Sequence, residues 1–259
     1  MAITAIHYSI LRSMFEQGVL PQHGAMLELG EANWYGDVSA LAMVEDIKRF
    51  VSDPVRRDAL VQRITEVVEK RDPETGLFDA AKVYYELFFA PSEMQVVDYH
   101  GTRLAQKLDL NGPVPLNRRF EVVINNGTAE HIFNIGQVFR TVHDVTVPGG
   151  LMIHEGPFRG WVDHGFYNPQ PTLFFDVAEF NRYEILGMFV GTPGSQTVFR
   201  IASREQVYAA AKNSQIPENA LLFTYLKKAA EDGPFRIPMQ GYYREGLSEA
   251  GMNAWRELR

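Results

Sequence analysis

The sequence predicts an α/β fold in which a mostly parallel β-sheet is covered by helices on both faces. Two observations lead to this prediction. Short apolar runs typical of buried strands alternate along the chain with longer stretches whose apolar residues recur every three or four positions, as they do in amphipathic helices. The strands also end at glycines or polar residues, as at Gly30 and Asn125, and ligands bind beyond the carboxyl ends of strands in such sheets.

Length and composition are those of an ordinary globular protein. The chain has 259 residues, of which 46% are hydrophobic and 22% are charged, and a chain of this length can bury a sizeable core without disulfides or metal ions. We expect one domain over residues 1–259, with an N-terminal helix at 3–17, a helical insertion at about 38–90 and a C-terminal extension at 229–259.

Cysteine content and charge exclude several classes of function. The absence of cysteine excludes disulfides, cysteine-ligated zinc, iron–sulfur clusters and a cysteine nucleophile. The formal net charge of −7, with no run of lysine or arginine, argues against nucleic acid as the main partner. Because no secretory signal and no apolar segment of about 18 residues is found, we expect a cytoplasmic protein without a membrane partner. The sequence does not decide whether the protein forms a homo-oligomer.

The stretch at residues 38–90 has helical apolar spacing throughout. Pro54 and an Asp-Pro-Glu-Thr-Gly turn at 72–76 separate it into pieces. It is longer than a simple crossover between two neighbouring strands requires. We expect part of it either to cover a ligand pocket as a lid or to add packing on one face of the sheet, and the sequence leaves both alternatives open.

The remaining elements follow from the same periodicity. Thr128 is a candidate N-cap for a helix at 129–145, and Pro148-Gly149-Gly150 should end that unit. The other helices are expected at 3–17 and 171–181, and the strands at 25–30, 94–99, 105–108 (weakly), 120–125, 151–154, 183–190 and 219–227.

Residues 120–154, FEVVINNGTAEHIFNIGQVFRTVHDVTVPGGLMIH, resemble a segment of the class I S-adenosylmethionine (SAM)-dependent methyltransferases. In that family an apolar fourth strand with a terminal acid or amide is followed by Glu-His, an amphipathic helix, Pro-Gly-Gly and the fifth strand. Here Asn125 and Asn126 end the strand, and Glu130 and His131 follow. The resemblance implies a three-layer Rossmann-like methyltransferase fold with a mostly parallel seven-stranded sheet and an inserted helical segment.

A second segment, MLELGEANWYGD at residues 26–37, resembles the family's first strand and SAM-binding turn, which usually reads acid-x-Gly-x-Gly-x-Gly. Glu28 and Gly30 match this pattern, whereas Ala32 and Trp34 stand at the next two glycine positions. Those glycines let the backbone approach the cofactor closely. The resemblance therefore implies a SAM-binding turn with a degenerate glycine motif and a rerouted loop.

Two further segments resemble the family's second and third strands. In MQVVDYHG, Asp98 stands where the family's acid accepts hydrogen bonds from the ribose hydroxyls of SAM. In LDLN, Asp109 stands where an acid or neighbouring backbone contacts the adenine, although an aspartate before Asn-Gly-Pro is equally typical of a turn. The resemblance implies SAM as the cofactor, bound by Glu28, Gly30, Asp98, Asp109, Asn125 and Asn126.

Polar and aromatic residues that follow the strand ends are the candidates for catalysis and acceptor binding. His131 and His164 are expected at such ends, where a neutral imidazole can take a proton from an acceptor hydroxyl or amine; a hydrogen bond within the loop is the competing role. The run HGFYNPQPTLFFDV, which begins at His164, resembles a stretch that lines the acceptor pocket in some family members. The candidate pocket residues are Trp34, Glu130, Trp161 and Tyr167.

No metal site is expected from the spacing of the histidines. The histidines considered are His100, His131, His143, His154 and His164. No two of them are four residues apart, which is the spacing of helical zinc motifs.

The resemblance implies an enzyme that transfers a methyl group from SAM to an oxygen or nitrogen atom of a small-molecule acceptor. Two alternatives remain open. One is a non-catalytic protein that binds SAM or another ligand on the same scaffold, which the missing glycines suggest. The other is a different Rossmann-like enzyme, such as an NAD(P)-dependent reductase. The sequence contains neither a P-loop nor a Gly-x-Gly-x-x-Gly motif, which disfavours ATP hydrolysis and ordinary nicotinamide binding.

Overall fold

The sheet at the centre of the molecule has seven strands among the residues that the structure describes. The computed structural model describes residues 2–70, 76–195, 197–244 and 246–257. The strands, in spatial order, are β4 (Glu93–Val97), β2 (Ala25–Leu29), β5 (Phe120–Asn126), β6 (Thr146–Arg159), β9 (Ala220–Lys227), β7 (Glu184–Gly191) and β8 (Phe199–Arg200). Only β9 and β8 run against the others, so the predicted mostly parallel sheet is confirmed.

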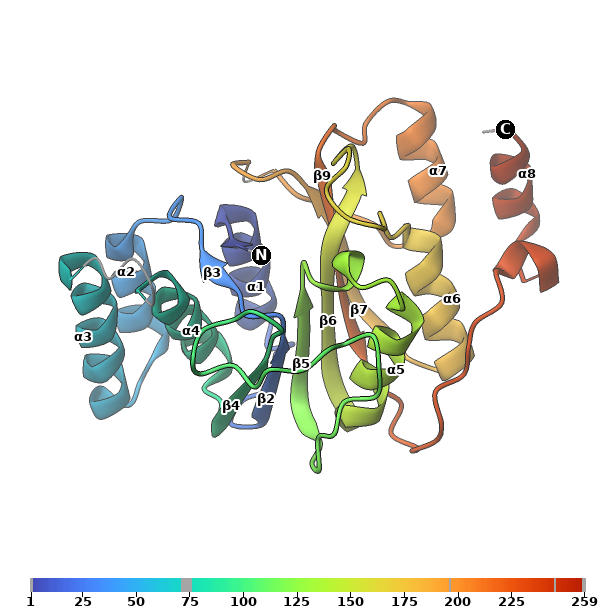
Figure 1. The fold of residues 1–259 in the computed structure, drawn as a ribbon. Coiled ribbons are helices and arrows are strands. Elements are labelled where there is room, and N and C mark those ends of the chain that lie inside the picture. The colour runs from blue at the N-terminus through green and yellow to red at the C-terminus, as the bar shows by residue number, and fades with distance from the viewer. Residues whose placement is uncertain (1, 71–75, 196, 245, 258–259) are drawn as a thin grey trace.

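Helices cover both faces of this sheet (Figure 1). One layer consists of α1 (Ala5–Glu16), α2 (Ala40–Phe50), α3 (Pro54–Lys70) and α4 (Gly76–Phe89), and the other of α5 (Ile135–Val145), α6 (Pro171–Asn181), α7 (Arg204–Lys212) and α8 (Glu249–Glu257). Each face of the sheet has its own hydrophobic core, because successive residues of a strand point to opposite faces. In β2, Met26 belongs to the core under α1–α4, whereas Leu27 belongs to the core on the other face. The predicted three-layer fold class is confirmed.

The N-terminal helix is tied to the loop that follows β2. A two-residue strand, β1 (Ala2–Ile3), pairs in parallel with β3 (Asn33–Trp34). The amide of Ala5 donates a hydrogen bond of 2.9 Å to Asp37 Oδ2 in the same loop. The helix predicted at residues 3–17 is α1, which begins after this short strand.

The insertion at residues 38–90 contains the three helices that its breaks predict. α3 begins at Pro54, and α4 begins at Gly76, the last residue of the predicted turn. Residues 72–75 of that turn lie outside the described residues. α4 buries most of its apolar side chains against the sheet and α1, whereas α3 buries only Leu60 and Ile64. α4 is therefore the crossover helix to β4, and α2 and α3 are additions to it.

Two details of the predicted elements are wrong. Residues 105–108 form no strand, since Gln106 makes only an isolated bridge to Val97. The helix predicted at 129–145 is split into a 3-10 turn, η1 (Ala129–His131), and α5, and Thr128 makes no capping hydrogen bond with its side chain. His131 is the last residue of η1 and lines a pocket at the carboxyl end of the sheet.

The Pro-Gly-Gly segment also behaves differently from the prediction. It does not end a unit before the next strand but lies inside β6, which begins at Thr146. Phe120 is paired with Thr146, whereas Val122 is paired with Leu151, so β6 carries extra residues opposite β5. Such a bulge bends the strand and interrupts the ladder locally.

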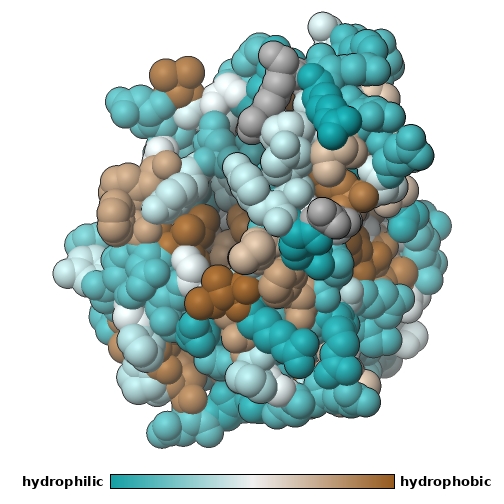
Figure 2. All heavy atoms as spheres, turned by 90° about the vertical axis from the view of Figure 1, so that its right-hand side faces the viewer, coloured by the Kyte–Doolittle hydropathy of each residue, from teal (hydrophilic) through white to brown (hydrophobic). Residues whose placement is uncertain are grey.

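The C-terminal extension lies on the outer face formed by α5–α8. The side chain of Asn181 accepts a hydrogen bond from Arg236 N at 2.7 Å and donates one to Arg236 O at 3.0 Å, and Gly241 N donates to Asp176 Oδ1 at 3.1 Å. Figure 2 shows this face as mostly hydrophilic, with apolar side chains gathered near its centre. Within the described residues, no helix has both the length and the apolar character needed to cross a membrane.

Candidate active site

A pocket of about 460 Å³ opens beyond the carboxyl ends of β2, β4 and β5. Strand order reverses here, since β4 and β5 lie on opposite sides of β2, and open α/β sheets bind ligands at such points. The pocket is lined by Gly30 after β2, by Asp98 and Asp109 in the loop between β4 and β5, and by His131 on η1, among other residues. No described residue of α2, α3 or α4 lines it, so the insertion does not cover this pocket.

Gly30 forms the turn at the end of β2. Its φ of +78° is in the left-handed region that favours glycine, and its amide donates a hydrogen bond of 2.7 Å to Val97 O. A Cβ atom at this position would lie 1.9 Å from Thr128 Oγ1, in the loop that follows β5. Glycine is therefore required both by the backbone conformation and by the close approach of the two loops.

Asp98, the predicted ribose-binding acid, organises the wall of the pocket. Its Oδ2 accepts a hydrogen bond of 2.7 Å from Glu31 N. Its Oδ1 accepts hydrogen bonds from the amides of His100 and Gly101, both at 2.7 Å. A carboxylate offers about four acceptor positions, so roughly one remains for a ligand hydroxyl.

Glu31 was not singled out by the sequence analysis, yet it holds the same loop. It is buried, and its Oε1 lies 2.7 Å from Lys82 Nζ on α4. It also accepts hydrogen bonds from the amide and the hydroxyl of Thr102. An acidic residue directly after Gly30 was the only signal in the sequence, and its partners lie more than fifty residues further along the chain.

Asp109 lines the pocket and also forms the turn that its sequence context predicts. Its Oδ1 accepts hydrogen bonds from the backbone and side-chain amides of Asn111, at 2.8 and 2.9 Å. These hydrogen bonds hold the pKa of Asp109 below its ordinary value. Both interpretations of this residue, the turn and the pocket wall, are therefore compatible in the structure.

Three residues predicted to bind the cofactor, Glu28, Asn125 and Asn126, are buried behind the pocket wall and do not line it. Glu28 Oε1 accepts a hydrogen bond of 3.2 Å from Ala32 N, and burial raises the pKa of Glu28 to about 8. Asn125 Oδ1 accepts a hydrogen bond of 3.0 Å from Ala129 N. These residues support the loops of the pocket from inside.

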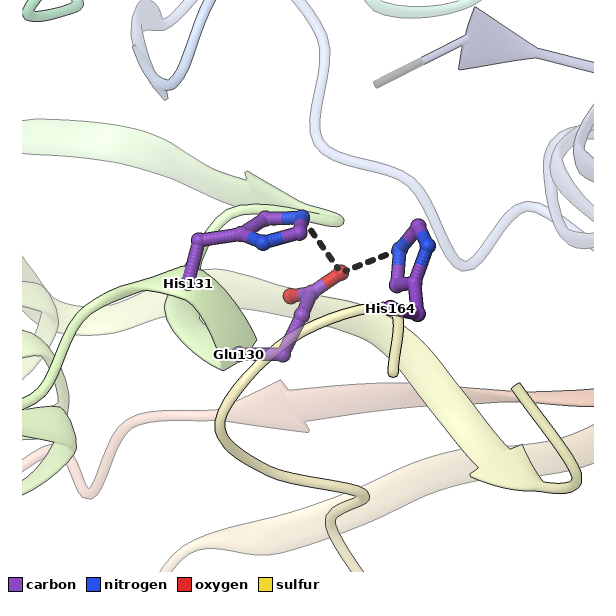
Figure 3. Close-up of side chains that lie close together, drawn as sticks. All are labelled: Glu130, His131 and His164. Carbon is purple, nitrogen blue, oxygen red and sulfur yellow. Dashed lines mark ion pairs between the residues drawn. The ribbon is translucent and has the colours of Figure 1, made fainter. Parts of the chain in front are cut away.

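His131 and His164, the candidate bases, meet at Glu130. Figure 3 shows the two imidazole rings on either side of the Glu130 carboxylate, with Glu130 and His131 on η1 and His164 in the loop after β6. Glu130 Oε1 lies 3.8 Å from His131 Nε2 and 3.9 Å from His164 Nε2. Although the sequence spacing predicts no metal site, these three side chains place their ligand atoms within 4.8 Å of one another.

Burial determines the protonation of this cluster. Glu130 is 1% exposed, and burial together with the nearby Glu155 carboxylate raises the pKa of Glu130 to about 8. Burial and the neighbouring His164 lower the pKa of His131. His131 is therefore neutral at pH 7, the state in which an imidazole can take a proton.

The aromatic residues predicted to line an acceptor pocket are divided between two places. The Trp161 ring lies 5.1 Å from the His164 ring, and Tyr167 N donates a hydrogen bond to Glu130 O, so both lie at the histidine cluster. Trp34 lines a different cavity of about 420 Å³, between β3 and the helices of the insertion. The structure thus brings Trp161 and Tyr167 to the site and Trp34 away from it.

A buried polar group that the sequence analysis missed lies between α1 and the ends of β5 and β6. His7 Nε2 is 3.1 Å from Asn126 Oδ1 and 3.6 Å from Glu155 Oε2. Both carboxylate oxygens of Glu155 and Nδ2 of Asn126 are buried without a hydrogen-bond partner. The only signal in the sequence was a polar residue on the apolar face of α1.

Comparison with known proteins finds matches among solved structures. No family model and no curated protein matches the sequence. A SAM-dependent methyltransferase from Mesorhizobium loti matches with 12% identity and a TM-score of 0.46, over 86% of this chain and 98% of that one. The N-methyltransferase NodS from Bradyrhizobium japonicum matches with 9% identity and a TM-score of 0.42, over 86% and 94%.

A third match is the 1,6-didemethyltoxoflavin-N1-methyltransferase from Burkholderia thailandensis, whose structure contains 1,6-didemethyltoxoflavin and S-adenosylhomocysteine. It has 11% identity and a TM-score of 0.36, over 86% of this chain and 76% of that one. All three matched proteins are methyltransferases by name. At this level of identity and similarity, neither an activity nor a substrate follows for this chain.

Proposed function

We propose that this protein transfers a methyl group from SAM to an oxygen or nitrogen atom of a small-molecule acceptor. One observation carries the proposal. Gly30, Asp98 and Asp109, which three separate motifs assign to SAM binding, line a single pocket at the point where strand order reverses. His131, a candidate base, stands in the wall of the same pocket. Residues selected independently along the sequence thus meet at one site.

The pocket has features that fit a nucleoside-containing ligand. Its volume of about 460 Å³ lies within the range of about 300–1,000 Å³ typical of small-molecule sites. Leu108, Leu110 and Ile132 supply apolar surface for an adenine ring, and the free acceptor position of Asp98 can receive a ribose hydroxyl. Gly30 leaves room for the backbone to approach the ligand closely.

The residues of the chain would act mainly by positioning and by deprotonation. SAM, when bound, supplies a methyl carbon that is activated by the adjacent sulfonium. Asp98 and Gly30 would orient the cofactor, and an apolar wall would exclude water from part of the site. His131 or His164 would take the proton of the acceptor, with Glu130 between the two rings.

The first expected result is that the protein binds S-adenosylhomocysteine, the product that remains after methyl transfer. Calorimetry should show binding in the micromolar range, roughly −8 kcal/mol, and thermal melting should shift upward. NAD(P)H, tested in parallel, should give neither effect. A heat signal with NAD(P)H alone would favour the reductase alternative, and the absence of heat and of a melting shift at about 1 mM S-adenosylhomocysteine would refute the proposal.

A turnover assay distinguishes an enzyme from a protein that only binds SAM. A panel of small hydroxyl- and amine-containing acceptors is incubated with SAM, and formation of S-adenosylhomocysteine is followed. Accumulation that depends on the acceptor supports methyl transfer. Tight binding of S-adenosylhomocysteine without turnover of any acceptor would favour a ligand-binding protein on this scaffold.

A second expected result concerns Asp98. Asp98→Ala should weaken the affinity for S-adenosylhomocysteine by roughly ten- to a hundredfold, because a hydrogen bond to a charged group contributes about 1.5–3 kcal/mol. Calorimetry measures this loss. An unchanged affinity would show that Asp98 does not bind the cofactor.

Lys82→Met is the matched control for this prediction. It removes the ion pair of Glu31 and so disturbs the loop beside Asp98, but it leaves the Asp98 carboxylate in place. We expect a smaller loss of affinity than in Asp98→Ala. An equal loss in both variants would mean that Asp98 acts only by shaping the loop.

A further inference from the structure

The Glu130 carboxylate faces two imidazoles at distances too long for direct hydrogen bonds. Its Oε1 lies 3.8 Å from His131 Nε2 and 3.9 Å from His164 Nε2, and hydrogen bonds of this type span about 2.7–3.2 Å. A metal ion about 2.0–2.1 Å from each ligand holds ligand atoms roughly 3.3 Å apart in tetrahedral geometry. The two distances from Glu130 Oε1 exceed this value by roughly 0.5 Å, and the ligand atoms all lie within 4.8 Å of one another, so the side chains would draw together by roughly 0.5–1.5 Å around an ion.

Two of the facing atoms are buried and have no partner. Neither Glu130 Oε1 nor His164 Nε2 makes a hydrogen bond, and the Glu130 side chain is only 1% exposed. A buried polar atom without a partner costs about 1–3 kcal/mol, and more when it is charged. The nearby Glu155 side chain, whose two oxygens are also buried and unpartnered, adds a second acidic group to this region. A cation between the three side chains would remove this cost.

We propose that Glu130, His131 and His164 form a binding site for a divalent transition-metal ion. The donor set decides the class of ion. Two imidazole nitrogens and one carboxylate oxygen suit Zn²⁺, Fe²⁺, Mn²⁺ or Co²⁺, whereas Ca²⁺ and Mg²⁺ prefer oxygen ligands alone. Three protein ligands leave coordination positions open, which is typical of catalytic rather than structural sites.

The backbone around the cluster holds the three ligands in place. Phe166 N donates a hydrogen bond of 2.8 Å to Glu130 O, so the loop carrying His164 is fastened to the turn carrying the other two ligands. At Gly165, a Cβ atom would lie 3.0 Å from Glu130 O and 3.2 Å from His131 Nδ1. Glycine between His164 and Phe166 thus permits the close contact of loop and turn that brings the ligands together.

The site borders the proposed cofactor pocket, because His131 lines both. An ion there would bind a hydroxyl or phenol oxygen of the acceptor and lower its pKa, which favours an oxygen acceptor over an amine. The histidines would then serve as ligands, and the ion rather than an imidazole would promote deprotonation. This consequence rests on the proposed function, whereas metal binding itself does not.

Metal titration of the full chain tests the proposal. The purified protein is freed of metal with a chelator, then titrated with Zn²⁺ by calorimetry and with Co²⁺ by visible absorption. We expect one ion per chain. His131→Ala and His164→Ala should each weaken binding by roughly a hundredfold or more, because losing even a hydrogen-bond partner behind a ligand costs about 10–100-fold.

His100→Ala is the matched control, since His100 lines the same pocket but lies outside the cluster. It should bind the ion with wild-type affinity. Glu130 is buried, so Glu130→Gln could prevent folding. The side chains of His131 and His164 are 44% and 29% exposed, so we expect their alanine variants to fold and to report on metal binding alone. Wild-type affinity in the His131→Ala/His164→Ala double variant, or no binding up to about 1 mM ion, would overturn the proposal.

S-adenosylhomocysteine binding, measured on the chelated and on the metal-loaded protein, keeps the two proposals apart. Binding of the metal without binding of S-adenosylhomocysteine would leave the metal site intact and remove the methyltransferase proposal. Binding of S-adenosylhomocysteine by a protein that takes up no metal would do the reverse, and would return His131 and His164 to the role of imidazole bases.

Discussion

Replacing His131 by alanine should lower the rate of methyl transfer by about 10²–10⁴-fold, the range typical for loss of a general base. The side chain is 44% exposed and stands in the pocket wall beside Glu130, so its removal should leave the core packing unchanged. Steady-state kinetics with an accepted substrate measures the effect. We expect kcat to fall while calorimetry gives a nearly unchanged affinity for S-adenosylhomocysteine.

His164→Ala tests the second candidate in the same assay. His23→Asn is the control, because His23 is exposed and precedes the amino end of β2, at the opposite edge of the sheet from the pocket, and asparagine tolerates its φ of +64°. It should turn over at the wild-type rate. If His131→Ala and His164→Ala both retain near-full turnover, neither residue assists deprotonation, and the rate depends on positioning alone.

Gly30→Ala should strongly weaken cofactor binding and lower the melting temperature. The added Cβ would lie 1.9 Å from Thr128 Oγ1, which is far inside van der Waals contact, and the φ of +78° costs a non-glycine residue about 1–2 kcal/mol. The loops after β2 and β5 must therefore separate, and both line the pocket. We expect a loss in S-adenosylhomocysteine affinity of at least a hundredfold, which corresponds to about 2.7 kcal/mol.

Two variants separate the clash from the backbone strain. Gly18 has a similar φ of +69°, but a Cβ there would have nothing within 4 Å, so Gly18→Ala should lose about 1–2 kcal/mol of stability without changing cofactor affinity. Gly30→Ala combined with Thr128→Gly removes the clash and should restore part of the affinity. Wild-type affinity in Gly30→Ala alone would show that the pocket does not bind the cofactor.

Elements with a strong local pattern were predicted well from the sequence. The helix predicted at residues 171–181 is α6 with the same bounds, since Pro171 sets its start and its last residues precede a left-handed Arg182. The strand predicted at 25–30 is β2. In contrast, α7 and α8 were not predicted from the sequence. Both helices are mostly polar and bury a single small residue each, Ala210 in α7 and Gly251 in α8, so no run of large apolar residues marks them.

The candidate site was predicted in part, because local sequence patterns place residues at strand ends but do not orient their side chains. Motifs identify residues at strand ends, and Gly30, Asp98, Asp109 and His131 do line one pocket. A motif does not say whether a side chain at a strand end points into the pocket or into the core. Asn125 is on the inner side, where its oxygen accepts a hydrogen bond from the amide of Ala129.

By itself, the sequence determined the order of the longer strands and of the helices with a clear apolar face, and with them the layered fold and the edge of the sheet at which a ligand pocket forms, because these follow from apolar periodicity along short stretches of chain. Only the tertiary structure decided which side chains meet beyond that edge. It paired Glu31 with Lys82 on α4, and it brought His164 from the loop after β6 to the carboxylate of Glu130. The path of a loop depends on distant contacts, such as the hydrogen bond from Phe166 N to Glu130 O, which no local pattern records.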